Sequence, residues 1–464
     1  MDAEENTILS GGSTFRREIG LFGGISLVGG MVIGSGIYYL GSEVLSRSHM
    51  SMGLSLICWL IGGVVSILGG LCFAELGASM PVAGGQTVYL SRAYHPIFGF
   101  INGFNLFSLN GSGSTAALAI ASVAFLNMAV QLNTITSKLL AIALIAVLTV
   151  LNLFGVKGAS FLQNFTMAFR MLPLVLIIVL GLTMGRQHLD LSLGKAFEGQ
   201  TGFTSVVSMI AFATFASLWA YEGWTNMNGV AEELKNPKRN LPLSIFISLG
   251  AITLVYTLFN FAIFRTLPPE TISNAMTDGN LYFGSVVAKQ LMGNFGYALV
   301  LSGMIVGVLG ALNGGILVFP RTYYAMAKDG YFPKSFAKLN KRGVPAIATI
   351  ASSIIACILV LLKTLDSLVS LVIFFQAALN MLTVIGVILC RKKYPDIERP
   401  YKVLGGIPVV ILSAALFAVL VINQLISDPA NSLLGLAIPV ISVPIYFIFR
   451  KINGGKDYSA DSLE

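Results

Sequence analysis

Long apolar stretches alternate with short polar segments along almost the whole chain. Each stretch is long enough to cross the hydrocarbon core of a bilayer, which takes about 20 helical residues. The third and eighth stretches are overlong because they include tilted ends or short interfacial helices. The pattern predicts an all-α membrane protein with twelve transmembrane spans, at residues 19–41, 53–80, 97–129, 134–154, 161–184, 203–231, 242–265, 284–327, 346–364, 367–391, 407–427 and 432–450.

Glycine or a carboxylate interrupts two of these stretches. The first interruption runs from Gly29 to Ile37 (GGMVIGSGI), and the second from Phe215 to Trp224 (FASLWAYEGW). Glycine weakens a helix, and a broken helix inside a membrane leaves backbone groups free to hold a polar solute. Paired breaks in corresponding halves of a membrane protein indicate the binding site of a secondary transporter.

The spacing of the two interruptions predicts an internal repeat. They lie in spans 1 and 6, so each repeat has five spans, and an odd number makes the second repeat enter the membrane in the opposite direction. We therefore predict a five-plus-five inverted repeat with discontinuous helices 1 and 6. Ordinary helix packing at glycine pairs such as Gly62-Gly63 is the alternative explanation of the glycines. The predicted segments are a cytoplasmic N-terminal tail (1–18), repeat 1 with spans 1–5 (19–184), repeat 2 with spans 6–10 (203–391), spans 11–12 (407–450) and a cytoplasmic C-terminal tail (451–464).

The composition also indicates a membrane protein that crosses the bilayer many times. Of 464 residues, 55% are apolar and 11% are charged, and the mean hydropathy is +0.81. The formal net charge of +8 comes from basic residues that gather in alternate loops, as the positive-inside rule describes. This bias predicts that both termini lie in the cytoplasm, and we expect the membrane to be the plasma membrane. The basic clusters are then orientation signals and not a nucleic-acid surface.

Residues that could carry enzyme or metal chemistry are scattered along the chain. The histidines lie in loops or at span ends, away from the cysteines, and no Cys-x-x-Cys pair occurs. We therefore expect no metal site, no cofactor and no disulfide framework. An enzyme would need such a cluster, and a channel would need a ring of equivalent filter residues, so we expect a transporter. The residues considered are His49, His95, His188, Cys58, Cys72, Cys357 and Cys390.

The two interruptions can recognise the charged ends of an amino acid. A broken helix exposes amide N–H groups at one end and carbonyl groups at the other. Glycine lets a ligand approach the backbone closely, so N–H groups and one hydroxyl can meet a carboxylate at Gly34, Ser35 and Gly36. Carbonyls beside the breaks can accept from an ammonium group, namely those of Val32, Ile33 and Trp219 to Glu222.

Six short motifs occur in order along the chain, on or beside the predicted spans. They are Ile33 to Ile37 (IGSGI), Ala74 to Gly77 (AELG), Pro81 to Tyr89 (PVAGGQTVY), Trp219 to Trp224 (WAYEGW), Glu232 to Pro242 (EELKNPKRNLP) and Asn313-Gly314. Together they resemble the L-amino acid transporter family of the amino acid-polyamine-organocation (APC) superfamily, and the bacterial serine/threonine exchangers within it. The resemblance covers nearly the whole chain.

This resemblance implies the LeuT-like APC fold and sodium-independent exchange of amino acids. We predict an antiporter of small to medium neutral L-amino acids that works by alternating access. By matching to the motifs, Ser35 and Gly36 would meet the substrate carboxylate. The remaining residues of the implied substrate-binding set are Val32, Ile33, Gly34, Ile37, Trp219, Ala220, Glu222 and Asn313.

Two of these residues have a specific role in the family and a simpler alternative. Trp219 matches the aromatic gate, where the indole would lie over the substrate and close the route to the outside. Packing among neighbouring helices is the alternative. Asn313 matches a position that lines the side-chain pocket, and a hydrogen bond between helices is the alternative.

Arg170 is a departure from the family pattern. The segment Gln163 to Arg170 matches one in which sodium-independent members carry a lysine in the fifth span. A guanidinium keeps its proton, so Arg170 could act as a fixed cation in place of sodium, bridging spans 1, 5 and 8, but could not carry protons. A snorkelling side chain near the cytoplasmic end of the span is the alternative.

Two carboxylates lie in or beside the predicted spans. Glu222 could attract a cationic substrate side chain or hold a proton, so a proton-coupled transporter that also accepts cationic amino acids is the alternative function. Glu75 is expected to pair with a basic group or cap a helix and not to move protons.

The expected partners are the amino acid substrate and the lipid bilayer, with no nucleic acid. Animal members of the family join a single-span glycoprotein through a cysteine in the loop after span 3. The corresponding loop, near Gln131 to Asn133, has no cysteine. We therefore expect no disulfide-linked heavy subunit.

Overall fold

The computed structural model describes residues 19–34, 36–81, 84–154, 156–197, 202–277 and 283–453. Within these ranges the chain is helical, and the β-type pairing found there is an isolated bridge between Ile19 and Leu234. Nine of the described helices are long and apolar enough to cross a membrane, or ten if one bent pair counts as a span. The prediction of an all-helical membrane protein is confirmed for this part of the chain.

The helices of the first half of the chain follow the predicted spans 1 to 5. They are α2 (Leu21–Val32), α3 (Gly36–Arg47), α4 (Met52–Ser79), α5 (Gln86–Ala93), α6 (Pro96–Asn105), the π-helical turn η1 (Leu106–Asn110), α7 (Gly111–Val130), α8 (Thr134–Leu153), α9 (Val156–Met184) and α10 (Gly194–Phe197).

The second half of the chain supplies the remaining helices. They are α11 (Phe203–Tyr221), the 3₁₀ helix η2 (Trp224–Glu233), α12 (Pro237–Thr266), α13 (Pro269–Thr277), α14 (Phe283–Lys328), the 3₁₀ helix η3 (Lys334–Ala337), α15 (Ala346–Leu362), α16 (Leu365–Lys393), α17 (Gly406–Ser427) and α18 (Pro429–Ile452).

The two overlong predicted spans have a structural explanation. The third is the continuous series α6, η1 and α7, and the eighth is α14, which joins two helices across a kink at Gly293, where φ is 65°. The fifth and ninth predicted spans contain shorter apolar helical parts, Met171–Met184 and Ala346–Leu362. The count of twelve therefore stays a prediction.

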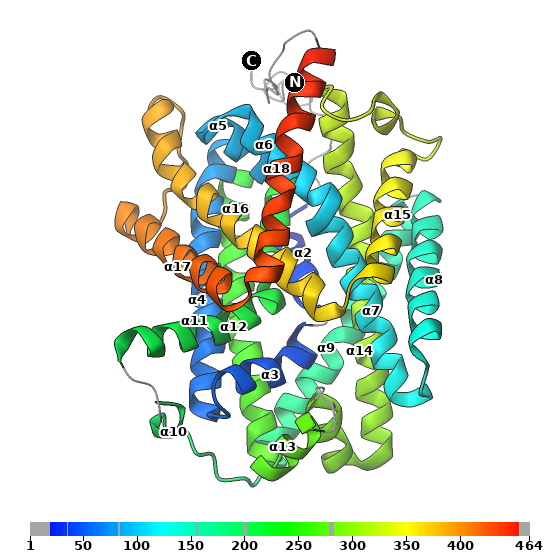
Figure 1. The fold of residues 1–464 in the computed structure, drawn as a ribbon, viewed down its shortest axis with the longest axis vertical. Helices are drawn as coiled ribbons and strands as arrows, with labels where there is room; N and C mark the ends of the chain where they lie inside the picture. The colour runs from blue at the N-terminus through cyan, green and yellow to red at the C-terminus, as the bar shows by residue number, and fades with distance from the viewer. Residues whose placement is uncertain are drawn as a thin grey trace.

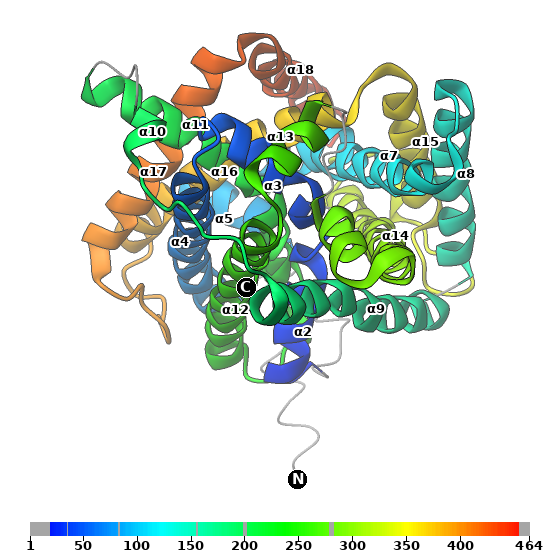
Figure 2. The ribbon, with the colours of Figure 1, turned by 90° about the horizontal axis from the view of Figure 1, so that it is seen from below.

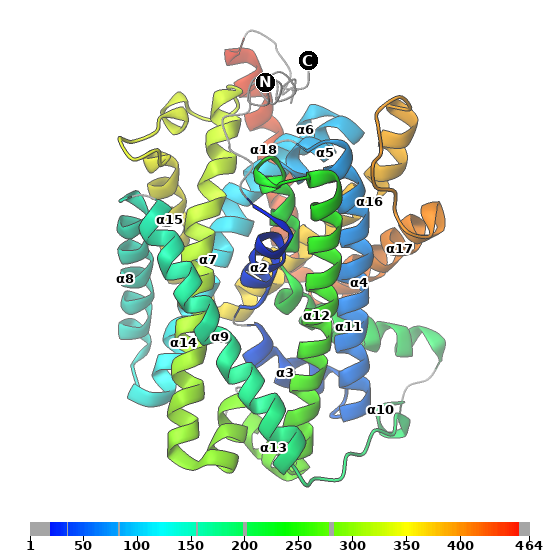
Figure 3. The ribbon, with the colours of Figure 1, turned by 180° about the vertical axis from the view of Figure 1, so that it is seen from behind.

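The helices form an upright bundle around α2 and α3 (Figure 1). We call the end at which α18 finishes the upper end, as drawn in Figure 1, and the end at which α13 lies the lower end. Figure 2, seen from below, shows α3 near the centre and α8 and α17 at opposite edges. Figure 3 shows α2 between α9 on one side and α12 on the other. The interrupted first span is thus covered by other helices and lies away from the periphery.

Both predicted interruptions are places where a helix stops and a new one begins. The axis bends by 54° between α2 and α3. At the second interruption α11 ends at Tyr221, Glu222 is extended, and Gly223 has a φ of 118°, a left-handed conformation that favours glycine. Because α3 packs against α11 and η2 packs against α2, the two interruptions meet inside the bundle.

An aromatic cluster supports the interruptions from the side of α4 and α12. The ring of Trp59 lies 6.1 Å from that of Tyr221 and 5.7 Å from that of Tyr256, and the two tyrosine rings are 5.3 Å apart. The Tyr221 hydroxyl donates to the carbonyl of Trp59 at 3.0 Å. All three side chains are fully buried. This cluster holds the end of α11 in place while leaving its other face to the cavity described next.

Candidate functional site

A cavity of about 90 Å³ lies where the two interrupted helices meet. One part of its wall comes from the first interruption and the end of α2: Gly30, Met31, Val32, Gly34 and Gly36. A second part comes from the second interruption: Trp219, Glu222, Gly223 and Asn226. The breaks predicted from sequence therefore border one shared space.

The opposite wall comes from helices that cross the whole bundle. It consists of Asn110, Ser114 and Leu118 near η1 and α7, and of Ala311, Gly314, Gly315, Val318 and Phe319 on α14. Small residues on α14 make room, and amide and hydroxyl groups on the other helices add polar contacts. None of the described residues that line the cavity is basic.

The structure divides the predicted substrate-binding residues into two groups. Those that line the cavity are Val32, Gly34, Gly36, Trp219 and Glu222. Those that are buried and are not among its lining residues are Ile33, Ile37, Ala220 and Asn313. Ser35 lies outside the described residues.

Tyr256 joins the backbones of the two interruptions. Its hydroxyl lies 3.0 Å from the carbonyl oxygen of Ala220 and 3.3 Å from that of Val32, and it can donate its proton to either. Trp219 also uses its carbonyl, which accepts from the backbone N–H of Glu222 at 3.2 Å. A carbonyl oxygen has two lone pairs, so each of these groups keeps one acceptor site. The geometry is compatible with the predicted contacts to an ammonium group.

Two of the cavity glycines of the first interruption, Gly34 and Gly36, have different surroundings. A Cβ added at Gly36 would lie 2.8 Å from Cα of Ala220, so this glycine allows α3 and α11 to pack backbone to backbone. A Cβ added at Gly34 would meet no atom closer than 3.9 Å, and its neighbours Ala311 and Leu118 both line the cavity. Of the two, Gly34 is the glycine whose missing side chain leaves space in the cavity.

Trp219 lies near the end of α11, three residues before the extended Glu222. It lines the cavity and keeps 8% of its surface exposed. This position combines features of a packed aromatic residue and of a wall that a substrate could touch. The gate role stays a prediction.

Asn313 takes part in a hydrogen bond between helices. It is fully buried on α14, and its Oδ1 accepts from Nδ2 of Asn152 on α8 at 2.9 Å. This is the arrangement that the sequence left open as the alternative to a pocket role. A side chain held in this way can still fix the position of the neighbouring Gly314, which lines the cavity.

Glu222 brings a carboxyl group to the cavity wall. No described residue forms an ion pair with it. A second void of about 10 Å³, with room for about one water molecule, lies beside Glu222 against Ser66 and Asn380. Arg170 belongs to α9, and its side chain is outside the described part of the structure. The predicted fixed cation therefore stays a prediction.

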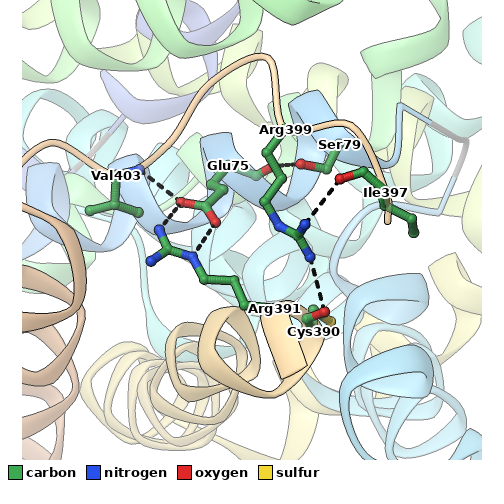
Figure 4. A network of polar contacts seen from close by, with 7 residues as sticks. All are labelled: Glu75, Ser79, Cys390, Arg391, Ile397, Arg399 and Val403. Atoms are coloured by element: carbon green, nitrogen blue, oxygen red, sulfur yellow. Dashed lines mark hydrogen bonds and ion pairs between the residues drawn. The ribbon is translucent and has the colours of Figure 1, made fainter. Parts of the chain in front are cut away.

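Glu75 forms the ion pair expected of it (Figure 4). Its carboxylate accepts from Nε and Nη2 of Arg391 at 2.7 and 2.6 Å, and from the backbone N–H of Val403 at 2.7 Å. The Glu75 side chain is 2% exposed, whereas that of Arg391 is 23% exposed. The pair fastens α4 to α16 and to the segment that leads into α17.

Several site residues were missed by the sequence interpretation. Asn110, Ser114 and Asn226 line the cavity, and Tyr256 joins the two interruptions. The available signal was the presence of amide and hydroxyl side chains inside predicted spans, where they need a partner or a polar ligand. The sequence did not indicate which of these side chains face the cavity.

The chain is similar to known amino acid transporters along most of its length. The family model described as amino acid permease matches residues 19–449. The b(0,+)-type amino acid transporter 1 of Mus musculus is 31% identical over 450 residues, which is 94% of this chain and 88% of the relative. The large neutral amino acids transporter small subunit 2 of Mus musculus is 30% identical over 454 residues, or 94% and 82%. The serine/threonine exchanger SteT of Bacillus subtilis (strain 168) is 29% identical over 443 residues, or 94% and 97%.

Proposed function

This chain belongs to the amino acid permease family of membrane transporters, which are not enzymes, and from that premise we propose that it exchanges small to medium neutral L-amino acids across the plasma membrane without sodium. One observation carries the proposal: two interrupted helices meet at a single cavity and leave backbone acceptors and a small residue, Gly34, on its wall. An amino acid presents a carboxylate and an ammonium group, which such a site can bind without charged side chains.

The size of the cavity favours a small substrate. A cavity volume of about 10–15 Å³ holds one group the size of a water molecule. The cavity of about 90 Å³ therefore holds about six to nine groups of that size. That is the size of a small amino acid with its backbone and a short side chain. We expect larger substrates to press against the two large aromatic residues of the wall, Phe319 and Trp219.

The proposed architecture is twelve spans with a five-plus-five inverted repeat. Its support is that the interruption between α2 and α3 and the one between α11 and η2 occur at corresponding places, five predicted spans apart. In this arrangement the upper end of the bundle faces the cytoplasm, because the basic loops and both predicted tails belong there. Trp219, the residue that matches the family's aromatic gate, would then close the route to the outside.

Sodium independence is proposed from Arg170. A permanent cation in the fifth span would repel sodium and would need no proton to stay charged. The test is counterflow in proteoliposomes, with and without sodium, for the wild type, Arg170→Lys and Arg170→Ala. We expect wild-type uptake to depend on amino acid inside the vesicles and not on sodium. Sodium-driven accumulation by the wild type, or full activity of Arg170→Ala, would refute this part of the proposal.

A second candidate function rests on Glu222. Its carboxyl group lines the cavity and pairs with no described basic residue, so it could hold a proton or a cationic substrate side chain. The same vesicles test this: accumulation driven by an imposed pH gradient, or exchange of lysine as fast as of serine, would favour the second candidate.

We also propose that the chain works without a disulfide-linked heavy subunit. One relative is named a small subunit, so a partner subunit has to be considered. The basis for the proposal is that the loop after the third predicted span has no cysteine. Counterflow by the purified chain alone supports the proposal, and activity that appears only with a second subunit would overturn it.

A further inference from the structure

A chain of buried amide side chains leads from the cavity wall into the protein. At its cavity end is Asn110, whose Nδ2 donates to Oε1 of Gln376 at 2.6 Å. Nε2 of Gln376 donates to Oε1 of Gln86 at 3.0 Å and to Oδ1 of Asn380 at 2.9 Å. Nε2 of Gln86 donates to Oδ1 of Asn380 and to Oγ1 of Thr383, both at 3.0 Å. The side chains come from η1, α5 and α16 and are at most 8% exposed.

Thr383, at the far end of this series of amide side chains, fixes the direction of every hydrogen bond in the series. A threonine hydroxyl has one proton, and Thr383 donates it to the carbonyl of Leu379 at 2.8 Å. Towards Gln86 the hydroxyl can therefore only accept, so Gln86 must turn its Nε2 to Thr383 and its Oε1 to Gln376. Gln376 must then turn its own Oε1 to Asn110.

The consequence at the cavity is a hydrogen-bond acceptor of fixed orientation. Asn110 directs its Nδ2 at Gln376, which leaves its Oδ1 on the side of the cavity, and no described residue donates to that oxygen. Asn110 is 6% exposed and lines the cavity, so this oxygen can accept a hydrogen bond from a donor on the ligand. Gln376, Gln86 and Asn380 are hydrogen-bonded to one another, and these bonds hold this orientation.

The local backbone supports the same assignment. Asn110 is the last residue of the π-helical turn η1, and such turns occur often at functional sites. The hydroxyl of Tyr323 donates to the carbonyl of Leu106, the first residue of the turn, at 2.9 Å. The turn is therefore held by a second helix, α14, which also lines the cavity.

We propose that Asn110 determines substrate specificity by offering an acceptor to the substrate side chain, and that Gln376, Gln86 and Thr383 are positioning residues. This inference rests on the proposed function and narrows its substrate class. The protein should prefer amino acids whose short side chain carries a hydrogen-bond donor, and threonine should be exchanged better than valine, which has the same shape with a methyl in place of the hydroxyl.

The test compares threonine and valine in counterflow with the full chain in proteoliposomes. The wild type should favour threonine, and Asn110→Leu should lower the ratio of threonine to valine by about three- to tenfold, the effect of one neutral hydrogen bond. Thr383 lies farther from the cavity, and Thr383→Val removes the hydroxyl that fixes the orientation of the amide side chains. This substitution should lower the same ratio by a smaller factor. A structural role alone would slow both substrates equally and leave the ratio unchanged.

Thr149→Val is the matched control. Thr149 is a buried threonine on α8 whose hydroxyl pairs with Ser353 at 2.7 Å, outside the cavity lining, so its loss should leave the ratio unchanged. Equal exchange of threonine and valine by the wild type, or an unchanged ratio in Asn110→Leu and Thr383→Val, would overturn the inference while leaving amino acid exchange intact. A wild type that exchanges no amino acid and is stabilised by none in thermal unfolding would instead refute the proposed function, and this inference with it.

Discussion

Replacing Gly34 and Gly36 separately by alanine distinguishes a cavity glycine that leaves space for the substrate from a cavity glycine that is also needed for helix packing. At Gly36 the new Cβ would lie 2.8 Å from Cα and 3.0 Å from the nitrogen of Ala220. Carbon atoms in favourable contact are about 3.5–4.0 Å apart, so α3 and α11 would have to separate by about 0.7 Å or more. Overpacking of this kind costs about 1–3 kcal/mol. Backbone atoms cannot relieve it by changing a rotamer.

At Gly34 the same substitution has room. The new Cβ would lie 3.9 Å from Cβ of Ala311 and from the carbonyl oxygen of Val32, which are ordinary contacts. The free energy of unfolding without substrate should therefore stay near that of the wild type. The methyl group would take space inside a cavity of only about 90 Å³ and would block close approach of a carboxylate to the backbone. We expect substrate affinity to fall by about tenfold, which corresponds to about 1.4 kcal/mol.

Thermal unfolding of the purified proteins, with and without amino acid, measures both effects. Gly36→Ala should unfold at a lower temperature than the wild type in the absence of substrate. Gly34→Ala should unfold with the wild type in the absence of substrate and should be stabilised less by a given concentration of it. Full stabilisation of Gly34→Ala by substrate would refute the assignment of the carboxylate to this break, and an unchanged unfolding temperature for Gly36→Ala would refute the packing argument.

Five further substitutions test Trp219, the Glu75–Arg391 ion pair and Glu222. Trp219→Ala should slow exchange much more than it weakens substrate binding, and Trp219→Phe should keep part of the rate, because closure needs bulk; unchanged turnover would make Trp219 a packing residue. Arg391→Ala should cost about 3–5 kcal/mol of stability because it leaves the buried carboxylate of Glu75 without its ion-pair partner. Glu75→Gln should cost less because the guanidinium of Arg391 can reach water. Equal losses of stability in thermal unfolding would contradict this reasoning. Glu222→Gln should keep neutral exchange in counterflow and lose any inhibition by lysine, and retained lysine inhibition would show that Glu222 does not hold the cation.

The class of protein and the location of its site could be predicted from the sequence because both depend on local patterns. A bilayer requires long apolar helices with satisfied backbone groups, so length and hydropathy reveal them. The segments from Gly29 to Ile37 and from Phe215 to Trp224 contain residues that weaken a helix locally, and these residues predict the breaks. Glu75 was expected to find a partner because a charge inside a membrane is costly without one. The free-energy cost of an unpaired charge does not depend on which residue pairs with it, so the sequence predicts a partner without identifying it.

Only the tertiary structure decided which residue does what at the site. Gly34 and Gly36 look alike in the sequence and both line the cavity, yet an added Cβ would have room at Gly34 and would collide with the backbone of Ala220 at Gly36. The role of Asn110 depends on Gln376 and Thr383, which lie more than 260 residues away along the chain. The direction in which the side chains of Asn110 and Gln376 point is set by contacts between helices. No local pattern of apolar and polar residues encodes those contacts.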